Sequence, residues 1–178
     1  MQRKTRTLTS MAILIAISIT LVALIHFPLI PSAAFLEYDP ADVPILIGTF
    51  AFGPLAGLAI TVVASVIQGF TVSIASGLYG ILMHIIATGS FVIAAGLFYS
   101  KHKTRKQAVI ALIAGTITMT VVMTAANLVI TPLFLKVPVD VVKGMLLTAI
   151  IPFNLLKAGI NSVITFLVYK SVSKYFHG

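Results

Sequence analysis

The sequence contains no cysteine and no tryptophan, and it has only four acidic residues among 178. Without cysteine, disulfide bonds, thiol catalysis and cysteine-ligated metal sites are excluded. Charged residues make up 9% of the chain, whereas a typical soluble domain contains about 25%. This shortage of charge, with a hydrophobic content of 59% and a mean hydropathy of +1.11, places the chain in a lipid bilayer.

The motifs of several enzyme classes are also missing. The chain has no Walker A sequence, no His-Glu-x-x-His zinc motif and no Gly-x-Ser-x-Gly nucleophile elbow. Its four histidines are too scattered to form a metal site, and the one in mid-span, His84, is interpreted as a packed, hydrogen-bonded residue. The acidic residues fall outside the expected spans, so no intramembrane carboxylate pair is expected. The sequence therefore predicts no enzyme, no metal and no cofactor.

One membrane domain, residues 1–178, accounts for the whole chain. Its six apolar segments cover approximately residues 8–27, 43–59, 61–77, 79–99, 107–130 and 146–170. A helix needs about 20 residues to cross the hydrocarbon core, so the second and third segments are short. A single long, bent helix is the alternative for these two, because Gly53-Pro54 and Gly57 can kink or break a helix.

The basic residues indicate the orientation of the helices, because cytoplasmic loops are enriched in Lys and Arg. Clusters of these residues precede the first segment, join the fourth to the fifth and follow the sixth: Arg3, Lys4, Arg6, Lys101, Lys103, Arg105, Lys106, Lys170 and Lys174. With six spans all three clusters lie on one side. We therefore expect an all-α integral protein of the cell membrane with six transmembrane helices and both termini in the cytoplasm. The net charge of +8 is explained by this topology and not by nucleic-acid binding.

An N-terminal signal peptide is the alternative for the first apolar segment. Three basic residues precede it, and Ser32-Ala33-Ala34 is a passable cleavage site. However, the apolar run approaches 20 residues, longer than the 7–15 of a signal peptide, and removing it would spoil the agreement of the charges.

The outer loop, residues 28–42, is rich in residues that restrict the backbone. The surrounding sequence FPLIPSAAFLEYDPADV contains three prolines and three carboxylates, and Asp39-Pro40 favours a turn. We expect an ordered loop that folds over the outer mouth of the bundle, with 36–39 available as a lid. Asp42 is expected to cap the second helix, since Asp is a good N-cap and Pro44 follows closely.

Lys157 is the most informative residue of the chain because it lies in the middle of an apolar segment. Asn154 and Asn161 lie three residues before and four residues after it, which places all three on one face of a helix. A charge at the bilayer centre costs about 2.5–3.5 kcal/mol on insertion scales. With about ten residues to either helix end, snorkelling is difficult, and no membrane carboxylate is expected as a partner. The position predicts a polar binding site inside the membrane.

Asn127, near the outer end of the fifth segment, can converge with Asn154 and Lys157 at a similar depth. These side chains suit a neutral polar heterocycle or a polyol, and the ammonium suits a carbonyl or an anion. For Asn127 and Asn161, a hydrogen bond that joins two helices is an equally good interpretation.

Small residues at four-residue spacing form a second signal. Ala12-x-x-x-Ala16 and Gly53-x-x-x-Gly57 both allow close approach of another helix. Each pattern fits either packing within the bundle or docking of a membrane partner.

The chain resembles the S components, the substrate-binding subunits, of energy-coupling factor (ECF) vitamin transporters, and specifically those for riboflavin. The resemblance spans nearly the whole chain and is most specific in residues 35–44 and 52–57. Asn154-x-x-Lys157 and Asn127 are similar to the polar positions that contact the flavin in this family. Ala12-x-x-x-Ala16 resembles the motif by which these subunits dock on the transmembrane coupling subunit.

The resemblance implies a six-helix bundle that binds riboflavin from outside as its transported ligand. The loop after the first helix would enclose the ligand, with Leu36, Tyr38 and Asp39 as contacts. Transport would need a coupling subunit and two ATPase subunits, which fits the missing Walker motif. An S component for another vitamin, or a small-molecule-binding protein of another transporter class, is the alternative.

Overall fold

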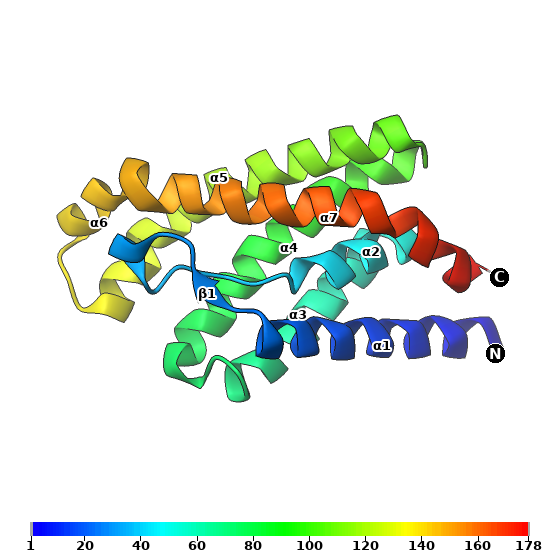
Figure 1. The fold of residues 1–178 in the computed structure, drawn as a ribbon, viewed down its shortest axis with the longest axis horizontal. Coiled ribbons are helices and arrows are strands. Elements are labelled where there is room, and N and C mark those ends of the chain that lie inside the picture. Colours follow the sequence, from blue (N-terminus) through cyan, green and yellow to red (C-terminus); the bar gives the residue numbers. More distant parts are fainter. Residues whose placement is uncertain (1, 178) are drawn as a thin grey trace.

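The computed structural model describes residues 2–177 and the side chains of residues 4–172. The side chains of Arg3 and Lys174, which the sequence assigns to the cytoplasmic face, lie outside this range. The chain is almost entirely helical (Figure 1). Its elements are α1 (Gln2–Leu24), β1 (Phe27–Pro28), the 3-10 turn η1 (Pro31–Ala33), β2 (Glu37–Tyr38), α2 (Asp42–Phe52), α3 (Pro54–Phe70), the 3-10 turn η2 (Ile74–Ser76), α4 (Gly77–Lys101), α5 (Arg105–Leu135), α6 (Val139–Met145), the π-helical turn η3 (Leu146–Ile150) and α7 (Ile151–His177).

The helices form an elongated bundle in which α1 begins and α7 ends at the same end of the molecule (Figure 1). Because α6, η3 and α7 follow one another without a break, the described chain has six helical segments. Four of them are long and apolar enough to cross a membrane, namely Lys4–Leu24, Ile74–Lys101, Arg105–Leu135 and Val139–Val172. Helices α2 and α3 are apolar but shorter.

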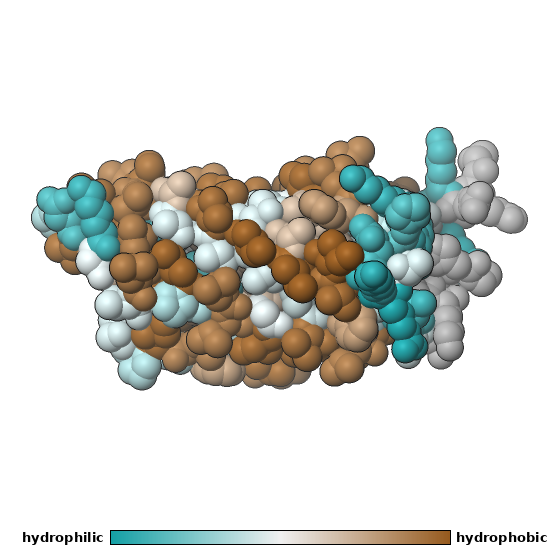
Figure 2. Space-filling model, turned by 90° about the horizontal axis from the view of Figure 1, so that it is seen from above, coloured by the Kyte–Doolittle hydropathy of each residue, from teal (hydrophilic) through white to brown (hydrophobic). Residues whose placement is uncertain are grey.

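The surface of the bundle is hydrophobic along most of its length, and hydrophilic residues gather at its two ends (Figure 2). Large apolar side chains such as Leu55, Leu147 and Leu167 are exposed, which is expected where the surrounding solvent is lipid. The interior contains α2, whose residues 42–51 are all buried. This central helix brings residues at its N-terminus deep into the protein.

The break between the second and third helices lies at Gly53, whereas the sequence-based boundary was drawn at residues 59–61, inside α3. Gly53 has φ 98° and ψ 172°, a conformation that is open essentially only to glycine. Pro54 follows as the first residue of α3, where its missing N–H costs nothing. Hydropathy runs smoothly across this junction, so only the Gly-Pro pair marks it.

The outer loop is folded. Strands β1 and β2 pair antiparallel, with Phe27 opposite Tyr38, and Ala33 and Leu36 pack against α6, η3 and α7 in a second hydrophobic cluster. At the end of the loop, Ser18 Oγ of α1 donates a hydrogen bond of 2.9 Å to the carbonyl oxygen of Ala41. Contacts with both α1 and α7 hold the loop across the end of the bundle opposite the termini.

The two small-residue patterns lie in different surroundings. Ala12 and Ala16 are exposed on α1, on the face opposite Leu14 and Ser18, which are buried. Gly57 is instead buried, and a Cβ added there would overlap Thr49 of α2. Gly57 of the glycine pattern therefore allows close packing within the bundle, whereas Ala12 and Ala16 of the alanine pattern stay exposed on α1.

Candidate ligand-binding site

A cavity lies beneath the outer loop, between the loop and helices α3, α4, α5 and α7. Its walls are mostly apolar and aromatic, with polar groups among them. The lining side chains come from the loop (Phe35, Leu36, Glu37 and Asp39), α3 and η2 (Ser65, Gln68, Ser73 and Ser76), α4 (Tyr79, Met83, His84, Ala87 and Thr88), α5 (Met119, Met123, Ile130, Thr131 and Phe134) and α7 (Phe153, Asn154 and Lys157).

Lys157 is paired, contrary to the expectation that no carboxylate would reach it. Its Nζ lies 2.7 Å from Oδ2 of Asp39, and the two side chains are only 11% and 9% exposed. The loop turns inward and delivers Asp39 to the middle of α7, 118 residues further along the chain. Removing one partner of such a buried pair typically costs about 3–5 kcal/mol, because the other charge stays uncompensated.

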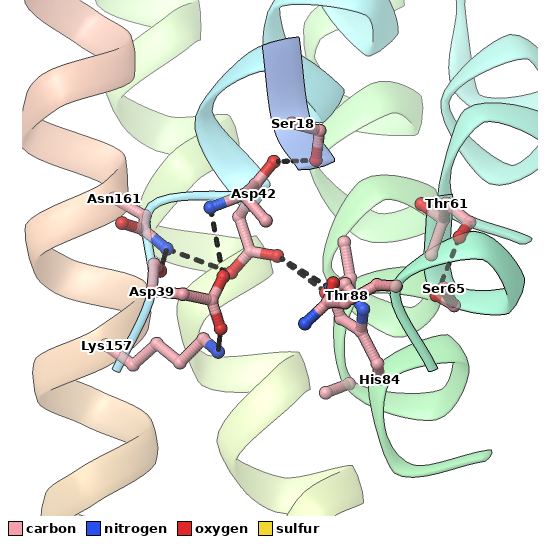
Figure 3. Close-up of polar contacts among 12 residues, drawn as sticks. Ser18, Asp39, Asp42, Thr61, Ser65, His84, Thr88, Lys157 and Asn161 are labelled. Carbon is pink, nitrogen blue, oxygen red and sulfur yellow. Dashed lines mark hydrogen bonds and ion pairs between the residues drawn. The ribbon is translucent and has the colours of Figure 1, made fainter. Parts of the chain in front are cut away.

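Asp42 is the second buried carboxylate, and it does not cap α2 as the sequence suggested. Although it is the first residue of the helix, it makes no capping hydrogen bond. Its carboxylate instead accepts hydrogen bonds from Thr88 Oγ1 at 2.6 Å and from Asn161 Nδ2 at 3.0 Å (Figure 3). Asp42 therefore ties the start of α2 to α4 and α7, and the interior holds two carboxylates where none was expected.

Asn161 connects α7 to three points of the loop and α2. Besides Asp42, its Nδ2 donates to the carbonyl oxygen of Asp39 at 3.2 Å, and its Oδ1 accepts from Tyr38 Oη at 3.0 Å. Burial and the neighbouring Asp39 carboxylate raise the pKa of Tyr38, so its hydroxyl stays protonated and keeps donating. One fully buried amide thus holds residues 38–42 in place.

Asn154 lines the cavity one helical turn before Lys157. Its Nδ2 donates 2.8 Å to the carbonyl oxygen of Ile150, the last residue of the π-helical turn η3. Such turns insert one extra residue and often occur at functional sites. Here the turn directly precedes the helix that presents both Asn154 and Lys157 to the cavity.

Asn127 lies behind the cavity wall and not on it. Its Nδ2 donates to the carbonyl oxygen of Met123 at 2.7 Å, and its Oδ1 accepts from Thr131 Oγ1 at 2.7 Å. Met123 and Thr131 both line the cavity, whereas Asn127 and Tyr38 do not. Of the six predicted ligand contacts, the cavity therefore brings together Leu36, Asp39, Asn154 and Lys157.

His84 is packed as expected, but the expected hydrogen bond is absent. Its Nε2 lies 3.6 Å from Asp42 Oδ1, and neither ring nitrogen has a hydrogen-bond partner among the described residues. The described part of the chain contains no group of three or more His, Cys, Asp or Glu residues that could hold a metal ion.

Sequence reasoning missed Asp42, Thr88 and His84 as parts of the site. The position of Asp42 at a helix start indicated a helix cap, and the positions of Thr88 and His84 in an apolar span indicated packing. The resulting arrangement has apolar and aromatic walls, one buried ion pair and the side-chain amides of Gln68 and Asn154. It can enclose a flat, largely uncharged molecule and hydrogen-bond its polar edge, but it presents no activated nucleophile.

Comparison with protein families matches residues 6–169 to the substrate-specific component of ECF transporters. The riboflavin transporter RibU of Streptococcus thermophilus is 32% identical over 93% of this chain and 82% of its own length. RibU of Staphylococcus aureus is 30% identical over 98% and 94%, and the riboflavin transporter FmnP of Bacillus subtilis is 29% identical over 93% and 91%.

The fold has a match among solved structures. The S component of a bacterial ECF transporter superposes with a TM-score of 0.84 and 28% sequence identity, covering 97% of this chain and 98% of that one. The similarity therefore extends over nearly the whole length of both chains.

Proposed function

The chain belongs to the substrate-specific components of ECF transporters, and from this premise we propose that its substrate is riboflavin. As a member of this family it is a multi-pass protein of the cell membrane, and it is a substrate-binding subunit of an importer and not an enzyme. It works with the energising module of the transporter.

One observation carries the choice of substrate. The polar groups Asn154 and Lys157 meet the loop residues Leu36 and Asp39 at one cavity, in a chain about 30% identical to three riboflavin transporters over nearly its whole length. Aromatic and methionine side chains, among them Phe153 and Met83, provide flat apolar walls for the isoalloxazine ring. Asn154 and the Asp39–Lys157 pair then hydrogen-bond the polar edge of the ring or the ribityl chain.

Asn127 and Tyr38 do not line the cavity, but each holds a residue of the site in place. Asn127 fixes the Thr131 hydroxyl at the cavity wall, and Tyr38 fixes Asn161, which in turn holds the backbone of Asp39. These contacts support a role in which both residues shape the site, while Leu36, Asp39, Asn154 and Lys157 touch the ligand.

We also propose the orientation and the assembly. Both termini lie in the cytoplasm, because the basic clusters concentrate at the end of the bundle where α1 begins and α7 ends. The loop and the cavity then face outward. The exposed face of Ala12 and Ala16 is the docking surface for a transmembrane coupling subunit, which carries two ATPase subunits.

The direct test is purification of the protein alone in mild detergent. We expect a flavin absorption spectrum that survives washing, with about one extracted riboflavin per chain. Apo protein should quench added riboflavin fluorescence, and an excess of an unrelated vitamin such as thiamine or biotin should not compete. A colourless protein that leaves riboflavin fluorescence unchanged but binds another vitamin would refute the choice of substrate and leave the family assignment intact.

The site itself is tested by Asn154→Ala and Lys157→Ala, each of which should weaken riboflavin binding at least about tenfold, roughly the contribution of one hydrogen bond. Lys143→Ala is the matched control, since Lys143 lies on α6 with its side chain 58% exposed, paired with Asp140. Wild-type affinity in both cavity variants would refute the assignment.

A further inference from the structure

The charges around the cavity do not favour an anion, although a lysine lies in its wall. Among the described residues that line it, Lys157 is the one cation, while Glu37 and Asp39 are both acidic. The ammonium is already neutralised by Asp39 at 2.7 Å. The sequence alone left an anionic ligand group open as a partner for Lys157, and this pairing removes that option.

Asp42 adds a further negative charge immediately behind the wall. It is fully buried, and its hydrogen bonds come from Thr88 and Asn161, which are uncharged donors. With His84 counted as neutral, the cavity and the layer behind it carry three carboxylates and one ammonium, a formal charge of −2. Asp39, Asp42 and Lys157 are buried, so their charges are screened far less than in water, whereas Glu37 lies exposed on the loop.

We propose that Asp39 is a specificity-determining residue that makes the site selective for uncharged flavin over phosphorylated flavin. The inference rests on riboflavin being the substrate and goes beyond it to the charge state that the site accepts. A phosphate ester carries a charge of −1.5 to −2 at pH 7. It meets a cavity that is already negative and a lysine whose charge is cancelled.

Lys157 can still hydrogen-bond the neutral polar edge of an uncharged ligand. Lys157 Nζ has three donors, of which Asp39 takes one, so a ligand carbonyl or hydroxyl can accept another. Removing the charge of Asp39 therefore frees the ammonium to attract an anion, whereas a neutral ligand loses at most one polar neighbour. The ratio of the affinity for riboflavin to the affinity for riboflavin 5′-phosphate reports this effect. A general loss of structure would lower both affinities together and leave their ratio unchanged.

The test is a fluorescence-quenching titration of apo protein in detergent with riboflavin and with riboflavin 5′-phosphate at one pH and salt concentration. We expect wild type to bind the phosphate at least about tenfold more weakly than riboflavin, and Asp39→Asn to shrink that ratio at least about tenfold. Asp39→Glu keeps the charge and should keep the wild-type preference. Asp140→Asn is the matched control, since that side chain is 80% exposed on α6 and should leave the ratio unchanged.

An uncharged 5′-ester of riboflavin separates charge from size. If wild type rejects the ester as strongly as the phosphate, or binds riboflavin and its phosphate equally well, the proposal is overturned without any variant. An unchanged ratio in an Asp39→Asn protein that still binds riboflavin overturns it as well. The same titration also shows whether wild type binds riboflavin at all. If it does not, the proposed substrate, on which this inference rests, is refuted instead.

Discussion

Asn161→Leu should release the outer loop while leaving the helical bundle folded. Leucine has the same number of non-hydrogen side-chain atoms as asparagine but cannot make hydrogen bonds, so the change removes the contacts with Tyr38, with the Asp39 carbonyl and with the Asp42 carboxylate. Two of these partners are neutral and one is charged.

The size of the effect follows from these three contacts. A neutral hydrogen bond contributes about 0.5–1.5 kcal/mol and one to a charged group about 1.5–3 kcal/mol, which gives about 2.5–6 kcal/mol for the loop against α7. The loop can lift, and its polar groups can then be hydrated, so the cost should appear as loop opening and not as unfolding. Since each 1.4 kcal/mol is a factor of ten, the opening equilibrium should shift at least about 50-fold.

Glu37 provides a selective probe of this opening, because it is the only glutamate in the chain. A glutamate-specific protease can cut only after it, giving fragments 1–37 and 38–178. In wild type we expect the bond to be protected although the Glu37 side chain is exposed, since Tyr38 is buried and β1 pairs with β2. When opening is fast relative to cutting, the initial cleavage rate follows the open population, so Asn161→Leu should be cut at least about 50-fold faster.

Riboflavin affinity should fall in parallel, because only the closed loop delivers Asp39 to the cavity. Ser162→Ala is the control on the same helix, since it removes one partly buried hydroxyl contact to Thr116 at 3.2 Å and should be cut at about the wild-type rate. Wild-type protection of Glu37 in Asn161→Leu would refute the reasoning. Faster cutting that coincides with loss of the cooperative thermal transition would show instead that Asn161 stabilises the whole bundle.

Two further predictions concern packing and topology. Gly96→Ala should destabilise the bundle by about 1–3 kcal/mol, because the new Cβ would lie 2.9 Å from the Cα of Pro54. Gly159→Ala has open space around the new Cβ and should be neutral or slightly stabilising. The two variants are compared by thermal melting in detergent. Because the chain has no cysteine, a membrane-impermeant maleimide applied to intact cells should label Ser32→Cys and not Lys103→Cys, and the reverse pattern would overturn the proposed orientation.

The helical architecture could be predicted from the sequence because it depends on local patterns. Long apolar runs specify helices in lipid whatever their neighbours are, so four long spans and an ordered proline-rich loop were identified. The junction of α2 and α3 was misplaced by several residues, since it depends on the backbone conformation at Gly53 and not on hydropathy.

The candidate site was predictable only in part. A lysine between two asparagines on one helical face marked the side of α7 where Asn154 and Lys157 line the cavity, because the cost of burying a charge does not depend on the rest of the fold. The interpretation of Asp42 as a helix cap was wrong, because its carboxylate found stronger partners in Thr88 and Asn161 on helices that local sequence cannot place beside it.

The sequence by itself determined that this chain is a bundle of apolar helices with a polar face around Lys157. Only the tertiary structure decided which residue neutralises that lysine. Asp39 precedes it by 118 residues and reaches it because β1 and β2 turn the loop back over the bundle while Asn161 fixes the loop backbone. Helix periodicity is a local property, whereas the approach of a loop carboxylate to a distant helix depends on the path of the whole chain.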